Sequence, residues 1–159
     1  MAARGKVDNR LLNELLRHPF FRRRPPKSTG REEFGVDFTE RVYHRAEKKG
    51  IADADIVASV TALSAKSIAQ AYHRYLKIMP DELILCGGGS HNRTLVEMLR
   101  AELPDVKMLS TDDFGISVDA REAVSFAILA WATINGITNN VPAATGAKKP
   151  VILGKIVPA

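Results

Sequence analysis

The feature that most constrains this fold is a short apolar run that ends in three consecutive glycines. Leu83 to Cys86 contains no polar residue, and Gly87-Gly88-Gly89 follows it directly. A run that is apolar throughout is typical of a strand buried on both faces of a parallel sheet. Helical spacing over 92–102 comes next, and Val106-Lys107-Met108-Leu109 is read as a second short strand. The sequence therefore predicts a strand–glycine turn–helix–strand unit across 83–109.

The rest of the chain reads as helices. Apolar spacing predicts helices within 7–18, 38–50, 53–79 and 119–134, and 151–153 is read as a last short strand or an extended tail. The fold class expected is helix-rich α/β with few, mostly parallel strands, forming a single domain over residues 1–159. Two or three strands are few for an α/β layer, so the chain resembles part of a larger sheet.

Finer expectations concern helix ends and buried faces. Asp53 or Asp55 is expected to cap the long central helix, and Asp119 is expected to cap the last one with Glu122 as its capping-box partner. The face of that last helix expected to be buried consists of Ala123, Val124, Ala127, Ile128 and Trp131.

Composition excludes several classes of protein. The chain is 45% hydrophobic, has a single cysteine and contains no apolar run near the length of a membrane span, which predicts a soluble, cytoplasmic protein without membrane contact. Residues 1–80 hold 16 Lys and Arg against 9 Asp and Glu. This basic half could face an anion such as a nucleotide, or it could be an ordinary solvated surface.

The glycine turn is the strongest candidate binding site. Gly87, Gly88 and Gly89 let the backbone approach a ligand, and the next helix directs its free N–H groups at the turn, which suits a phosphate. Asn92 could bind a ribose hydroxyl or hold the turn. The alternative is a turn that needs glycine only for packing, because the run matches neither a dinucleotide fingerprint nor a Walker A loop.

Two further segments carry polar groups. Lys27, Ser28, Thr29 and Arg31 lie in a proline-stiffened loop that could bind an anion or could be an exposed basic loop. The segment 115–123 places Asp119 and Glu122 three residues apart at a helix start, where they could orient a sugar hydroxyl or a metal.

The sequence does not support a metal site, a catalytic cysteine or nucleic-acid binding. The four histidines, His91 among them, show no metal-ligand spacing, so no metal site is predicted. Cys86 has no identifiable base beside it. Nucleic-acid binding is disfavoured, because Arg22-Arg23-Arg24 has no interleaved aromatic residues.

Four separated motifs, taken in order, give the chain a resemblance to a known family. They are Pro26 to Glu32, Cys86 to Asn92, Gly115 to Ala123 and Val141 to Ala147. Together they resemble the anhydro-N-acetylmuramic acid kinases, and the match extends from about Gly5 to Pro158.

This resemblance implies an actin-like fold of two ribonuclease-H-like lobes, with ATP in the cleft between them. Such kinases open the 1,6-anhydro ring of anhydro-N-acetylmuramic acid and phosphorylate the sugar with ATP and Mg²⁺, in peptidoglycan recycling. The resemblance places Gly87, Gly88, Gly89 and Asn92 on the nucleotide-binding turn. It places Lys27, Ser28, Thr29 and Arg31 in a loop near the cleft, and Glu122 on the sugar side.

The resemblance also implies that much is missing. Members of the family are more than twice as long, and neither their first phosphate loop nor the segment with the general-base aspartate occurs here. We therefore expect a C-terminal, nucleotide-binding part that lacks the N-terminal lobe and is inactive alone. An exposed apolar edge is expected to cause poor solubility or self-association, with the missing lobe or a homo-oligomer as its partner. The alternatives are a non-catalytic nucleotide- or sugar-binding module and a basic polyanion-binding domain.

Overall fold

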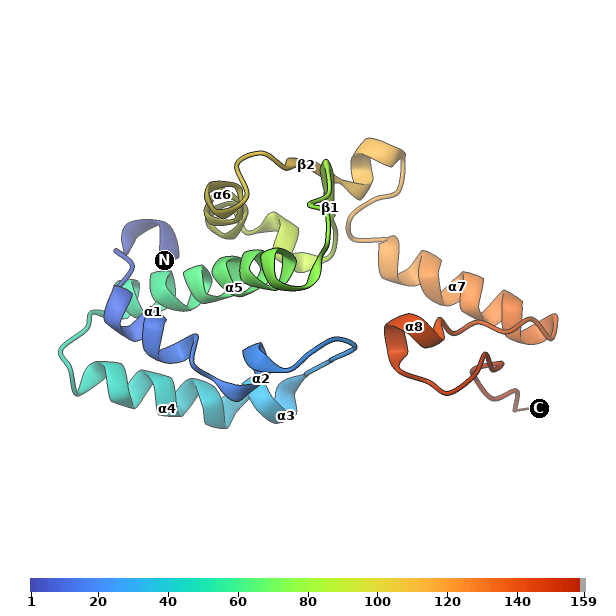
Figure 1. Cartoon of the computed structure of the whole chain (residues 1–159), viewed down its shortest axis with the longest axis horizontal. Coiled ribbons are helices and arrows are strands. Elements are labelled where there is room, and N and C mark those ends of the chain that lie inside the picture. Colours follow the sequence, from blue (N-terminus) through green and yellow to red (C-terminus); the bar gives the residue numbers. More distant parts are fainter. Residues whose placement is uncertain (158–159) are drawn as a thin grey trace.

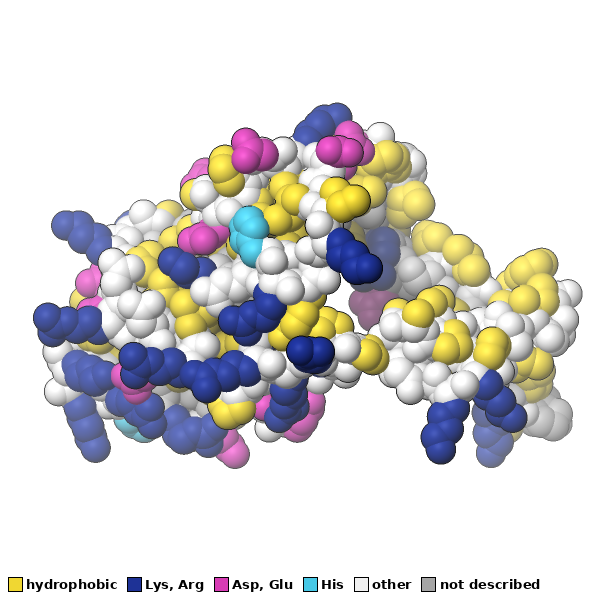
Figure 2. Space-filling view, in the orientation of Figure 1, with side chains coloured by type: hydrophobic (Ala, Val, Ile, Leu, Met, Phe, Trp, Pro, Cys, Tyr) yellow, Lys and Arg dark blue, Asp and Glu magenta, His cyan; other side chains and the backbone are white. Residues whose placement is uncertain are grey.

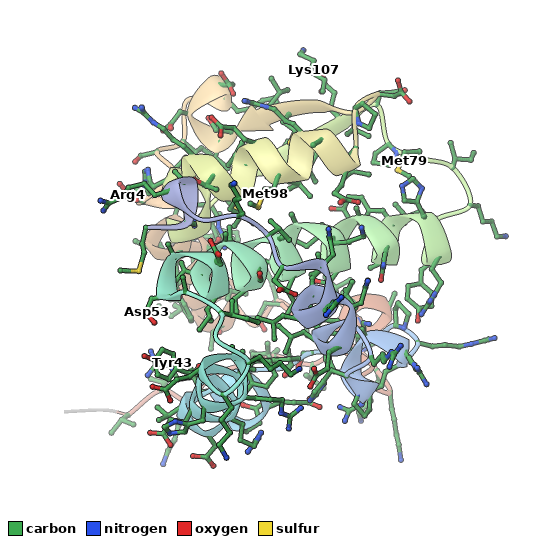
Figure 3. The ribbon with its side chains drawn as sticks, turned by 90° about the vertical axis from the view of Figure 1, so that its left-hand side faces the viewer. Arg4, Tyr43, Asp53, Met79, Met98 and Lys107 are labelled. Carbon is green, nitrogen blue, oxygen red and sulfur yellow. The ribbon has the colours of Figure 1, made fainter. Side chains whose placement is uncertain are left out.

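The long helix α5 (Asp53–Tyr75) is the central element of the structure, a computed structural model that describes residues 1–157. Before it come η1 (Ala2–Arg4), α1 (Asn9–Leu15), α2 (Pro19–Arg22), α3 (Arg31–Phe34) and α4 (Val36–Glu47). Helix α6 (Arg93–Glu102) crosses one side of α5, and α1 and α4 lie on the other side (Figure 1). Figure 3 shows the same layers after a turn of 90°.

Helix α1 shows how a local signal builds this region. Asp8 is its N-cap, with a carboxylate that accepts hydrogen bonds from the N–H groups of Arg10 and Leu11 at 2.9 and 2.8 Å. Its apolar positions are buried as their spacing predicts, with Leu11 and Leu12 at 1% and 4% exposure. The cap fixes where the helix begins, and the apolar face fixes its orientation on α5.

The start of α5 differs from the prediction. Its N-cap is Ala52, without a side-chain cap, and neither predicted aspartate caps the helix. Asp53 instead accepts a hydrogen bond from the Tyr43 hydroxyl at 3.3 Å, visible in Figure 3 as the meeting of α4 and α5. Asp55 accepts one from the Lys6 N–H at 2.7 Å. The cap prediction was wrong because both carboxylates are used by segments that are distant in the sequence.

Two apolar clusters form on opposite sides of α5. The first joins α1, α4 and the first half of α5 through Leu11, Leu12, Leu15, Val42, Ala46, Ile56, Ala62 and Leu63. The second joins the later half of α5 to α6 and the sheet through Ala65, Ala69, Leu99, Leu103 and Val106. Met98 packs against both clusters. Small residues on α5 let α6 approach it closely.

The predicted order of strand, turn, helix and strand is confirmed, but the first strand is not buried on both faces, because Ile84 is 49% exposed. It comprises β1 (Glu82–Leu85), η2 (Gly88–His91), α6 and β2 (Lys107–Ser110). The strands pair in parallel, with Leu83 opposite Met108 and Leu85 opposite Ser110. The described residues contain no other strand, so 151–153 is an extended tail and the sheet has two strands. The fold is therefore helix-rich with a small parallel sheet.

Helix α7 (Arg121–Ile134) follows η3 (Thr111–Phe114) and is largely uncovered. Only Ala132 is buried, whereas Val124, Ile128 and Trp131 are 40%, 61% and 61% exposed. The prediction of a buried face was wrong for these residues, because nothing among residues 1–157 covers it. In Figure 1 the helix stands apart from α5, and in Figure 2 it lies where hydrophobic side chains gather on the surface.

The end of the chain returns along α7 after α8 (Pro142–Thr145). Asn139 fixes this return, because its amide nitrogen donates to the Leu129 carbonyl and the Thr133 hydroxyl, both at 2.9 Å. Its side-chain oxygen accepts from the Leu153 N–H at 2.6 Å. No helix of the described chain has both the length and the apolar character that crossing a membrane requires.

Candidate nucleotide site

The glycine turn lies at the carboxyl end of β1, where ligands bind in open α/β sheets. Gly87 has φ 75° and so needs a residue without a side chain. The turn is closed by Ser90, whose N–H and hydroxyl both donate to the Gly87 carbonyl, at 3.0 and 2.6 Å. Gly87 is therefore explained by backbone conformation alone.

Gly88 and Gly89 have no such internal explanation. Neither has a positive φ. A Cβ at Gly88 would meet no atom within 4 Å, and a Cβ at Gly89 would meet only Leu95 Cδ2, at 3.8 Å. That distance is an ordinary van der Waals contact. Within residues 1–157, packing therefore does not require glycine at either position, which weakens the interpretation of the turn as purely structural.

Asn92 is the N-cap of α6. Its side-chain oxygen accepts a hydrogen bond from the Leu95 N–H at 3.2 Å, and its own N–H donates to the Gly89 carbonyl at 3.1 Å. The structure thus gives Asn92 the turn-holding role, one of the two roles considered for it. The cap fixes the start of α6, whose positive dipole end is oriented toward the turn.

His91 connects the glycine turn to the third motif. Its Nε2 lies 2.7 Å from Asp119 Oδ1, although the two residues are 28 positions apart. The hydrogen bond to Asp119 raises the pKa of His91 above its ordinary value, and the negative charge of Asp112 raises it further. From the sequence, His91 was only excluded as a metal ligand, and its place just after the glycines was the available signal for a role in the turn.

Asp119 does not cap α7, which corrects the prediction. The N-cap of this helix is Ala120, and the N–H groups of Ala120 and Arg121 donate to the Ser117 carbonyl instead. Asp119 is free to reach His91 because the turn at 117–120 closes itself. Glu122 lies in the first turn of α7 and is exposed, with no hydrogen bond to another described residue.

The structure divides the four predicted residues of the basic loop into two groups. Lys27 Nζ donates to the carbonyl oxygens of Phe20 and Phe21, and the Thr29 hydroxyl donates to Glu33 at 3.3 Å. Ser28 and Arg31 are exposed and make no side-chain hydrogen bond or ion pair within residues 1–157. The first two residues therefore hold the loop, and the other two are available to a ligand.

The basic loop also touches the fourth motif. A Cβ at Gly146, which follows α8 and has φ 74°, would lie 3.3 Å from Pro26 Cγ. The four motifs thus meet in two pairs, the first with the fourth and the second with the third. In Figure 2 the surface is hollowed between the body around α5 and the region of α7 and α8. No group of three or more potential metal ligands occurs within 1–157.

Comparison with known proteins gives one consistent result. The family model described as anhydro-N-acetylmuramic acid kinase matches residues 1–159. Proteins with that name are 48% identical over 160 residues in Caldanaerobacter subterraneus subsp. tengcongensis and 44% over 156 residues in Rippkaea orientalis. A third, from Salinibacter ruber, is 42% identical over 154 residues.

These matches cover nearly all of this chain but not of its relatives. They include 98%, 98% and 96% of the chain, but only 40%, 41% and 39% of the respective relatives. The chain therefore spans about two fifths of the length of the curated relatives it matches. The chain belongs to the anhydro-N-acetylmuramic acid kinase family.

Proposed function

We propose that residues 1–159 form the nucleotide-binding part of an anhydro-N-acetylmuramic acid kinase. The observation that carries this proposal is the open space at Gly88 and Gly89, where the fold itself does not require glycine. A backbone without side chains, beside the N-terminus of α6, suits the phosphates or ribose of ATP. Mg²⁺ would accompany the ATP and supply neutralisation of charge on its phosphates.

The reaction proposed for the whole protein is opening of the 1,6-anhydro ring and phosphorylation of the sugar at O6. Phosphoryl transfer depends on positioning and on charge stabilisation from both sides of the phosphate. In this chain Glu122 would contact the sugar, and the His91–Asp119 contact would hold the sugar-side segment against the nucleotide turn. We propose that the general base that activates water is supplied by residues outside this sequence.

We further propose that a larger sheet covers α7, within a ribonuclease-H-like lobe of an actin-like kinase. A helix that is apolar on every side is normally buried. Here the exposed apolar side chains include Phe126 and Ile134, at 62% and 73%. In β1, Ile84 is 49% exposed, and a two-stranded parallel sheet is rarely stable without further strands. Both features fit strands supplied by polypeptide that this sequence does not include.

Gly88→Val tests the nucleotide site. The added side chain enters open space, so folding is retained, but it occupies the position proposed for the nucleotide. We expect the affinity for ATP, measured by calorimetry, to fall by about tenfold or more, as when charge-assisted hydrogen bonds to phosphate are lost. Ala101→Val, on the exposed side of α6, is the control and should bind ATP like the wild type. Unchanged affinity in Gly88→Val would return the turn to a structural role.

A separate experiment tests the proposal that this chain binds the nucleotide while residues outside it supply the general base. We expect the 159-residue chain alone to show no ATP-dependent phosphorylation of anhydro-N-acetylmuramic acid. Joining it to the unmatched part of the Caldanaerobacter relative should produce activity, because that part would supply the base and the second side of the cleft. Phosphorylation by the chain alone, at the rate of the joined protein, would refute the division.

A further inference from the structure

The side chain of Lys27 is directed into the protein rather than left free in the basic loop. Its Nζ lies 3.2 Å from the Phe20 carbonyl oxygen and 3.4 Å from that of Phe21, at the end of α2. The same ammonium lies 4.8 Å from the centroid of the Phe20 ring and 5.6 Å from that of Tyr75. Carbonyl oxygens at a helix C-terminus and aromatic faces both stabilise a cation. Two of its three N–H donors are therefore used within the chain.

Other contacts tie the same stretch of backbone to α5 and α3. The Tyr75 hydroxyl lies 2.8 Å from the Arg23 carbonyl oxygen, to which it donates. Glu33 receives both the Arg23 guanidinium, at 3.2 Å, and the Thr29 hydroxyl, at 3.3 Å. Among these contacts, Lys27 donates to backbone carbonyl oxygens, whereas Arg23 pairs with the Glu33 carboxylate. Without it, the Phe21 carbonyl oxygen and the Tyr75 ring lose their cation, whereas the Phe20 carbonyl keeps the Arg23 N–H at 3.2 Å and the Phe20 ring keeps the Arg23 guanidinium.

Ser28 and Arg31, by contrast, have no internal role in the described chain. Both are exposed, on either side of Thr29, which is itself held by Glu33. The Arg31 guanidinium offers a planar set of donors that matches a phosphate. The loop is therefore held by hydrogen bonds at Lys27 and Thr29, whereas Ser28 and Arg31 have no side-chain partner within residues 1–157.

We propose that Lys27 is a positioning residue that holds the 25–31 loop, and that Ser28 and Arg31 are the groups that bind a phosphate-bearing ligand there. The ligand class is that of the proposed function, a nucleoside triphosphate, and the assignment of Ser28 and Arg31 depends on that function. The positioning role of Lys27 does not, because it is a property of the protein without ligand.

Hydrogen–deuterium exchange of the ligand-free protein tests the positioning role, with Lys27→Met as the variant and Arg31→Met as its matched control. We expect the amides of 20–31 to exchange about tenfold faster in Lys27→Met, because the charged bonds that hold them are lost. Arg31→Met should leave exchange of the free protein unchanged but reduce ATP affinity about tenfold. Unchanged exchange in ligand-free Lys27→Met would overturn the positioning role.

A measurement on the wild type keeps the proposal testable if Lys27→Met does not fold. The ammonium signal of Lys27 in ¹H–¹⁵N spectra should be protected from solvent exchange and should not shift when ATP is added. A large shift with ATP would identify Lys27 as a direct ligand and overturn the proposal. If ATP changes no signal of the wild type, either at the glycines or at Arg31, both the proposed function and the assignment of Ser28 and Arg31 are refuted. The hydrogen–deuterium exchange result would still decide the positioning role of Lys27.

Discussion

The N-terminal region up to α5 and the C-terminal region from α7 onward have similar apolar patterns but very different burial. Leu11, Leu63 and Ala46 are at most 5% exposed, inside a closed cluster. In α7 the large apolar side chains are exposed, although their spacing is equally helical. Figure 2 shows the same contrast at the surface, with basic side chains over the first region and hydrophobic ones over the second. Periodicity thus identifies an apolar face, and only a partner buries it.

Truncation of a core leucine should give the largest effect. Leu11 is 1% exposed and lies between α1 and α5, so Leu11→Ala is expected to lower the free energy of unfolding by about 2–5 kcal/mol. The measurement is urea unfolding followed by circular dichroism. Val57→Ala, at a 36% exposed position of α5, should cost much less. Equal losses in the two variants would contradict the contrast between covered and uncovered positions.

A buried serine should give the next largest effect. Ser59 is 0% exposed, and its hydroxyl accepts from the Asp8 N–H at 2.8 Å and donates to the Asp55 carbonyl at 2.7 Å. Ser59→Ala leaves the N–H of the half-buried Asp8 without its side-chain acceptor, which should cost about 1–3 kcal/mol of unfolding free energy. Ser64→Ala, at an exposed position of the same helix, is the matched control and should change stability by less than about 0.5 kcal/mol.

The elements that the sequence predicted well are those fixed by neighbouring residues. The β1–turn–α6–β2 unit follows from a short apolar run, three glycines and an Asn92 cap, all local signals. The buried face of α1 was equally predictable. Two cap predictions failed, because Asp53 and Asp119 bind Tyr43 and His91 from distant segments. Such pairings depend on how elements approach each other, which one sequence does not reveal.

In the candidate site, too, local features were predictable from the sequence and contacts between distant segments were not. That Gly88 and Gly89 lie in open space, and that Lys27 turns inward while Arg31 does not, could be learned only from the folded chain. The family resemblance placed the glycine turn and the basic loop at one cleft, and the structure joins the four motifs in two pairs. The sequence could not indicate which side chains would be used internally, because Lys27 and Arg31 belong to the same basic loop and differ only in what lies beside them.

Substitution on α7 should have almost no effect on the stability of this chain. Ile128 and Trp131 are both 61% exposed, so Ile128→Lys with Trp131→Lys should change the free energy of unfolding by no more than about 0.5 kcal/mol per site. The same change should reduce self-association, measured by sedimentation velocity, because it divides an exposed apolar surface. Joined to the unmatched part of a relative, the variant should lose stability, since the helix would then be covered. A large loss in the chain alone would show that α7 is already packed.

The contact between the glycine turn and the segment before α7 should respond to pH through His91. Because Asp119 raises its pKa in the folded chain, the stabilisation is fully present below about 6.5 and is lost as pH rises through the higher folded value. Asp119→Asn removes the main cause, so the pKa of His91, followed by NMR of the imidazole, should fall. Glu14 provides the contrast, because hydrogen bonds from Lys49 and Arg45 lower its pKa below 4.5. Its contribution is therefore lost only in acid, as pH falls through that lowered value. Comparing the wild type with Asp119→Asn between pH 6 and 9 isolates the His91 contact, because the other histidines are the same in both proteins. An unchanged His91 pKa in Asp119→Asn would show that the contact does not form in solution.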